Sequence, residues 1–150
     1  MHQILTGFIA GAVSGVFMGM ISHLLFRLRI FKSSLIMIDG SFLFRTLKLQ
    51  GSPPVVAGAG LCIHLVTSGA FGALYFPACA ILGLDAGTAG SFAAVSLYVA
   101  VLWLSMLFIA LPVSGEGILG RKSGSLSWLE QLILHGIYCI LYYMCLKLLL

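Results

Sequence analysis

The sequence predicts an all-α integral membrane protein, a four-helix transmembrane bundle with a cytoplasmic interfacial amphipathic segment between its first and second helices. Of its 150 residues, 61% are hydrophobic and only 8% are charged, whereas a soluble domain carries about 25% charged residues. A chain this short cannot bury so much apolar surface in a water-soluble core, so the bilayer must be part of its solvent. The length fits a single membrane domain over residues 1–150.

Four segments have the roughly 20 apolar residues that a spanning helix needs. We expect these spans at residues 4–26, 55–82, 88–111 and 127–149. The pair Pro53-Pro54 breaks the chain before the second span, and Pro112 ends the third. The N-terminus lacks the positive region and the cleavage site of a signal peptide, so the first span is expected to remain in the mature protein.

Residues 31–50 mix hydrophobic side chains with Lys32, Asp39, Arg45 and Lys48, and are too charged to span a bilayer. We expect this stretch to lie at the membrane interface. Gly40 falls inside it and argues against one continuous helix. Asp39 is expected in a solvated loop.

The charges predict the orientation of the chain. Eight Lys and Arg residues oppose four Asp and Glu residues, which gives a net charge of +4. Most of the basic residues fall in the loops after the first span and before the fourth, at positions 27, 29, 32, 45, 48, 121 and 122. The positive-inside rule places these loops in the cytoplasm and both termini outside it, in a cell inner (plasma) membrane. No motif indicates nucleic-acid binding.

Small residues recur at every fourth position of the spans. The first span carries Gly7, Gly11, Gly15 and Gly19, the second Gly60, His64, Ser68 and Gly72, and the fourth Gln131, His135, Cys139 and Tyr143. Such rows mark helix contacts in lipid, where close backbone approach replaces the hydrophobic effect. We therefore expect helix packing along Gly7, Gly11, Gly15, Gly19 and Gly72, and expect bulky neighbours such as Leu134 to face lipid. The alternative is a glycine-lined pore in a homo-oligomer.

Histidines inside the spans are the candidate functional residues, because ionisable groups in a membrane are rare and default to a functional hypothesis. His64 and His135 lie at comparable depths on parallel helices, roughly 14 and 12 Å from the expected helix starts. Two facing imidazoles suit the axial ligation of haem b. Gly60, Ser68 and Gly136 would then leave room for the macrocycle, with Gln131 beside it.

Three other interpretations of the histidines stay open. His23, His64 and His135 could bind one transition metal. The imidazoles could relay protons together with Glu130 and Tyr138. The simplest interpretation is structural: hydrogen bonds between helices, for example from His64 to Gln131 or to Tyr142.

The leading functional hypothesis is a small integral membrane subunit of a larger membrane complex, redox-active through haem b held between His64 and His135. The first alternative is a transport or channel-like oligomer with the glycine-rich first helix at the subunit contact. The second is a cofactor-free structural or assembly subunit. The expected partners are the lipid bilayer and other membrane subunits or a second copy of the chain. The sequence leaves open whether the protein is an enzyme.

Overall fold

The chain folds into a bundle of four long helices. The computed structural model describes residues 2–150, apart from the side chains of residues 86 and 87. The long helices are α1 (His2–Arg27), α3 (Pro53–Ile81), α7 (Ser127–Leu149) and a composite third helix. The composite helix runs from α5 (Phe92–Ser105) through a π-turn, η1 (Met106–Ala110), into α6 (Leu111–Val113). Each of the four is long and apolar enough to cross a membrane, so the predicted fold class is confirmed.

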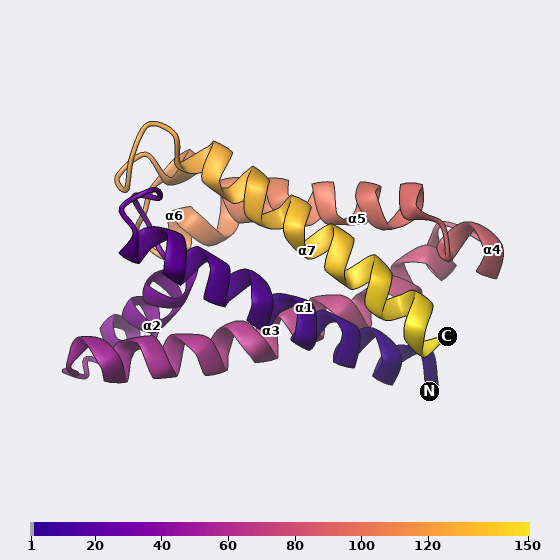
Figure 1. The fold of residues 1–150 in the computed structure, drawn as a ribbon, viewed down its shortest axis with the longest axis horizontal. Helices are drawn as coiled ribbons and strands as arrows, with labels where there is room; N and C mark the ends of the chain where they lie inside the picture. The colour runs from indigo at the N-terminus through magenta and orange to yellow at the C-terminus, as the bar shows by residue number, and fades with distance from the viewer. Residues whose placement is uncertain (1) are drawn as a thin grey trace.

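Three short helices complete the fold. They are α2 (Leu35–Thr46) between the first two spans, α4 (Ala86–Ala89) between the second and third, and the 3₁₀ turn η2 (Ile118–Gly120) before the fourth. Both termini and α4 lie at one end of the bundle, and α2 and the two long loops lie at the other (Figure 1).

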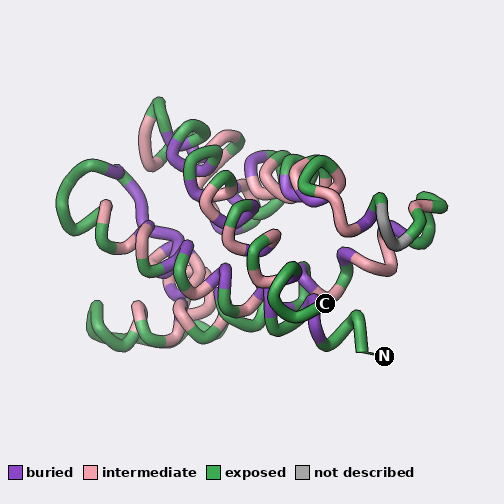
Figure 2. Tube along the Cα trace, turned by 45° about the vertical axis from the view of Figure 1, so that its right-hand side comes forward, coloured by how far each residue is buried: buried purple, intermediate pink, exposed green. Residues whose placement is uncertain are grey.

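Helix α1 is the centre of the packing. It contacts both α3 and α7, whereas α5 packs on α7 and makes little direct contact with α3. Buried positions follow the inward faces of the helices, and exposed positions follow their outward faces (Figure 2). The exposed positions include Leu97, Val101 and Phe108 of the third span. In a membrane protein such outward apolar surface meets lipid.

Backbone contact joins α1 to α3 along the glycine row Gly7, Gly11, Gly15 and Gly19. A Cβ atom on Gly7 would lie 2.4 Å from the carbonyl oxygen of Gly72, and one on Gly11 would lie 2.8 Å from the Cα of Gly72. Further along α1, Gly15 faces Ser68 of α3 and Gly19 faces the ring of His64. The glycine row is therefore buried within the chain and is not available as the contact with another subunit.

Helix α2 is continuous through Gly40, so the break expected there was wrong. Ser34 caps its start by accepting a hydrogen bond from the backbone N–H of Met37 at 3.4 Å. Gly40 is present for packing, because a Cβ atom there would lie 2.0 Å from the carbonyl oxygen of Val56. At the far end of α2, the Arg45 guanidinium donates to the carbonyl of Ser114. Helix α2 thus closes the loop end of the bundle.

The buried face of α7 differs from the row expected from the sequence. Leu134, expected to face lipid, is fully buried, and His135 is only partly buried. The reason is geometric: a four-residue step turns a helix by about 400°, so a row at that spacing drifts off one face by about 40° per step. The buried side chains of α7 are those of Ser127, Glu130, Gln131, Leu134, Tyr138, Cys139, Tyr142 and Leu146.

Candidate functional site

A cavity of about 290 Å³ lies inside the loop-side half of the bundle. All four spans and α2 contribute to its walls, and its lining is mostly apolar, with Phe71 and Met106 among the contributors. Both His64 and His135 line it. His64 is about 16 Å along α3 from Pro53, and His135 is about 12 Å along α7 from Ser127, at 1.5 Å per residue.

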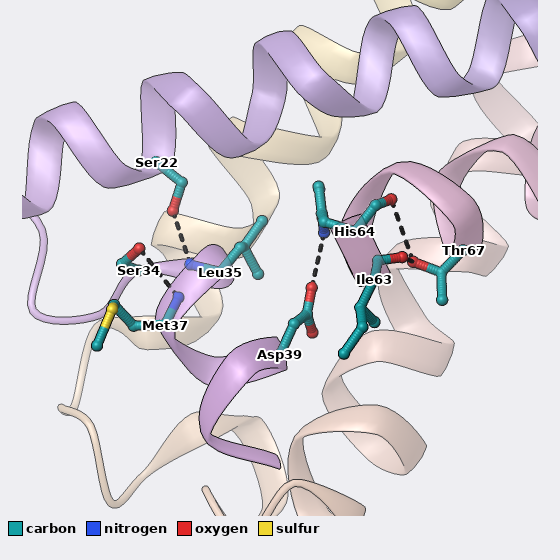
Figure 3. A network of polar contacts seen from close by, with 8 residues as sticks. All are labelled: Ser22, Ser34, Leu35, Met37, Asp39, Ile63, His64 and Thr67. Atoms are coloured by element: carbon teal, nitrogen blue, oxygen red, sulfur yellow. Dashed lines mark hydrogen bonds and ion pairs between the residues drawn. The ribbon is translucent and has the colours of Figure 1, made fainter. Parts of the chain in front are cut away.

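His64 is held by a carboxylate from α2. Its Nδ1 atom is hydrogen-bonded to Oδ2 of Asp39 at 2.9 Å (Figure 3). The expectation of a solvated Asp39 in a loop was wrong, because Asp39 lies on α2 and its side chain is only 22% exposed. The other nitrogen of His64, Nε2, is buried and has no hydrogen-bond partner among residues 2–150. A Cβ atom on Gly19 would lie 3.0 Å from the ring, so the glycine gives the imidazole its space.

His135 is oriented in the same way by its own helix. Its Nδ1 atom donates to the backbone carbonyl of Gln131, one turn earlier, at 2.8 Å. Its Nε2 atom forms no hydrogen bond within the described part of the chain. Two imidazoles therefore border one cavity with Nδ1 occupied and Nε2 unpaired.

His23 lies apart from this pair. Its Nδ1 is 3.1 Å from Oγ of Ser34, and it borders a separate apolar groove with Arg27 and Gly58. Within residues 2–150, side chains of His, Cys, Asp and Glu form no group of three that could hold a metal ion. The arrangement of His23, His64 and His135 around a single metal is therefore not formed.

Of the residues expected to make room for haem, Ser68 lines the cavity, whereas Gly60 and Gly136 are not among its lining residues. A Cβ atom on Gly60 would lie 1.8 Å from the carbonyl oxygen of Ile36, so α2 already fills that position. Gly136 is exposed, with open space beside it, and the Ser68 side chain lies against Gly15. The cavity is at the lower limit of pockets for drug-sized ligands, about 300–1,000 Å³.

The polar partners expected for His64 are engaged elsewhere. The carboxylate of Glu130 accepts from the backbone N–H of Lys32 at 2.9 Å and from the hydroxyl of Ser33 at 3.2 Å. Glu130 therefore anchors the α1–α2 loop through these two hydrogen bonds, neither of which involves a histidine. The hydroxyl of Tyr142 donates to the Gly72 carbonyl at 2.8 Å.

Gln131 and Tyr138 form no hydrogen bond with the His64 nitrogens among the described residues. The hydroxyl of Tyr138 donates to the Ser68 carbonyl at 3.4 Å. The side-chain oxygen of Gln131 is buried and unpaired within residues 2–150. The partner of His64 is Asp39, which was not predicted from the sequence. The available signal was a single acid among the apolar residues of the segment 31–50.

The cavity reaches the lateral surface of the bundle between α3 and the π-turn. Thr67 and Phe71 on α3 and Ala110 on η1 are lining residues that are also exposed. Nearer the termini the same two helices are bridged, because the hydroxyl of Tyr98 donates to the Phe71 carbonyl at 2.6 Å. The π-turn adds Met106 and Ala110 to the lining, and π-turns inside α-helices are frequent at functional sites.

The fold and the cavity define a four-span helical membrane protein with a mostly apolar cavity, bordered by two histidines, inside its bundle. Comparison with known protein families, with curated proteins and with solved structures finds no match.

Proposed function

We propose that this protein is a small integral membrane subunit that binds a lipophilic molecule drawn from the bilayer, with a polar group of that molecule held by His64 and His135. The observation that carries the proposal is the pairing of two partly satisfied imidazoles with one apolar, laterally reachable cavity. Ligand sites commonly combine apolar walls with a few convergent polar groups.

The unpaired nitrogens favour binding over a purely structural role. A buried polar atom without a partner costs about 1–3 kcal/mol, and one inside a membrane has no bulk water to satisfy it. A structural hydrogen bond explains Nδ1 of His64, which links α3 to α2. A structural role does not explain why Nε2 of the same ring is buried without a hydrogen-bond partner among the described residues. A ligand hydrogen-bonded to this atom would remove the cost.

The alternatives inferred from the sequence receive less support. The size of the cavity argues against haem b, and the burial of the glycine row against α3 argues against a channel built on that row. An assembly subunit without a ligand would give no function to the unpaired Nε2 atoms of His64 and His135.

We further propose that the loop end of the bundle faces the cytoplasm and both termini face outward, in a plasma or inner membrane. The basic loops gather at one end of the bundle, opposite the termini (Figure 1), which follows the positive-inside pattern. The bilayer is the source of the ligand. Other membrane subunits are the partners that would use or supply it.

Mass spectrometry of the purified protein tests the proposal. The protein is isolated in mild detergent, and molecules retained by the intact chain are identified in native spectra. We expect a lipophilic molecule that is retained by the wild type, is lost in His135→Leu, and is kept in His23→Leu, the matched histidine outside the cavity. Equal retention by both variants, or no retention by the wild type, would refute the proposal. An absorption band of bound haem would restore the redox hypothesis instead.

A further inference from the structure

We infer that an apolar groove at the loop end of the bundle binds an anionic phospholipid, with an acyl chain against the groove wall and the phosphate at the guanidinium of Arg27. The groove, of about 390 Å³, lies between α1, α2 and α3. It is separate from the cavity that His64 and His135 border, because the two have no lining residue in common. The inference goes beyond the binding function proposed above and does not depend on it.

The walls of the groove are apolar and open to the outside of the bundle. Met20 and Leu24 of α1 are 54% and 57% exposed, and such surface on a spanning helix meets lipid. On α3, Gly58 and Leu61 line the same groove. A Cβ atom on Gly58 would meet nothing within 4 Å. The glycine therefore leaves space in which an acyl chain can lie.

Two contacts hold α2 against this part of α1, so the groove is formed before a lipid enters it. The backbone N–H of Leu35 donates to the hydroxyl of Ser22 at 3.0 Å (Figure 3). Nδ1 of His23 lies 3.1 Å from the hydroxyl oxygen of Ser34. A preformed site needs less ordering of the protein on binding, which favours affinity.

Arg27 lies at the depth expected for a lipid headgroup. It is the last residue of α1 and lines the groove. The helix rises by about 10 Å from Met20 to Arg27, so the apolar wall leads to a cationic group. After Arg27, the exposed apolar residues Leu28 and Ile30 flank the exposed Arg29. This mixture of apolar and basic side chains is typical of the boundary between headgroups and acyl chains.

The charge of Arg27 has no counter-charge within the protein. Among the described residues, no carboxylate forms an ion pair with its guanidinium, and none lines the groove. The acidic residues at this end of the bundle, Asp39, Glu116 and Glu130, bond to a histidine, to hydroxyls and to a backbone N–H. Arginine binds phosphate through paired N–H groups. An anionic headgroup would therefore supply the missing counter-charge.

Native mass spectrometry in mild detergent tests the inference with two lipids that share their acyl chains, palmitoyl-oleoyl phosphatidylglycerol and palmitoyl-oleoyl phosphatidylcholine. We expect wild type to prefer the phosphatidylglycerol, and Arg27→Gln to lower this preference about fivefold, the contribution of one basic residue near an anionic surface. Lys48→Gln removes one charge at the same end but outside the groove, and should keep the preference. No preference in wild type, or equal losses in the two variants, would overturn the inference.

The groove itself is tested by Gly58→Leu, which fills the open space without a change of charge. This variant should lower the binding of phosphatidylglycerol severalfold. Gly136→Leu, at a second exposed glycine with open space beside it, should leave the binding unchanged. Equal binding by the two leucine variants would contradict an acyl chain in the groove. Glycerol phosphate has the anionic group without the chains, so its retention at the same concentration as the lipid would also overturn the assignment.

Discussion

Replacing Gly72 by alanine tests whether α1 and α3 depend on direct backbone contact. The added Cβ atom would lie 2.3 Å from the Gly7 carbonyl oxygen and 2.8 Å from the Cα of Gly11. Real Cβ contacts essentially never fall below 3.0 Å, so the helices must separate by at least the missing 0.7 Å. A gap of this size forfeits a quarter to a half of the dispersion energy at each affected contact. Overpacking of this kind costs about 1–3 kcal/mol.

The control for Gly72→Ala is an alanine at Gly58 or Gly136, where an added Cβ meets nothing within 4 Å. All three variants gain the same helix propensity, about 0.5–1 kcal/mol, so the comparison isolates the packing term. Unfolding in micelles, followed by tryptophan fluorescence, should show Gly72→Ala less stable than either control by about 1–3 kcal/mol. If Gly72→Ala unfolds together with the controls, the close contact between α1 and α3 does not exist.

Three other changes probe the polar contacts. Asp39→Ala leaves the ring of His64 without its partner, so we expect a loss of about 1–3 kcal/mol in the free energy of unfolding, measured in the same micelle assay. Glu130→Ala removes the acceptor that holds the α1–α2 loop, so limited trypsin digestion should cut that loop faster while the spans stay protected. Tyr142→Phe leaves the Gly72 carbonyl without the tyrosine hydroxyl, which should cost about 0.5–1.5 kcal/mol; an unchanged midpoint would show that this bond contributes nothing.

The four spans could be predicted from the sequence because a bilayer imposes a simple length and composition rule. The bounds of the third span were less accurate. It was expected to start at residue 88, but α5 starts at Phe92, after the separate short helix α4. Pro112 was expected to terminate it, but the helix continues to Val113. Five residues of π-turn precede the proline, and neither hydropathy nor the position of the proline encodes that change in helical register.

Asp39 could not be predicted as a site residue because its role depends on a contact between distant segments. Its partner His64 is 25 residues away, and the two meet only because α2 folds back onto α3. That approach depends on Gly40 and Gly60, where the backbones of α2 and α3 are in contact. From the sequence, Gly40 was expected to interrupt the helix and Gly60 to leave space for a cofactor. Both glycines instead serve the contact between helices.

The looseness of the third span explains how a ligand could reach the cavity. Only four described residues of this span are buried, Val95 and Val99 of α5, Leu107 of η1 and Leu111 of α6, whereas α1 buries nine residues. Few buried contacts mean a low free energy for local displacement. Movement of α5 and η1 away from α3 would therefore widen the lateral opening of the cavity while α1, α3 and the pair His64–Asp39 stay in place. The helix with the least burial is thus the one that separates the imidazoles from the bilayer.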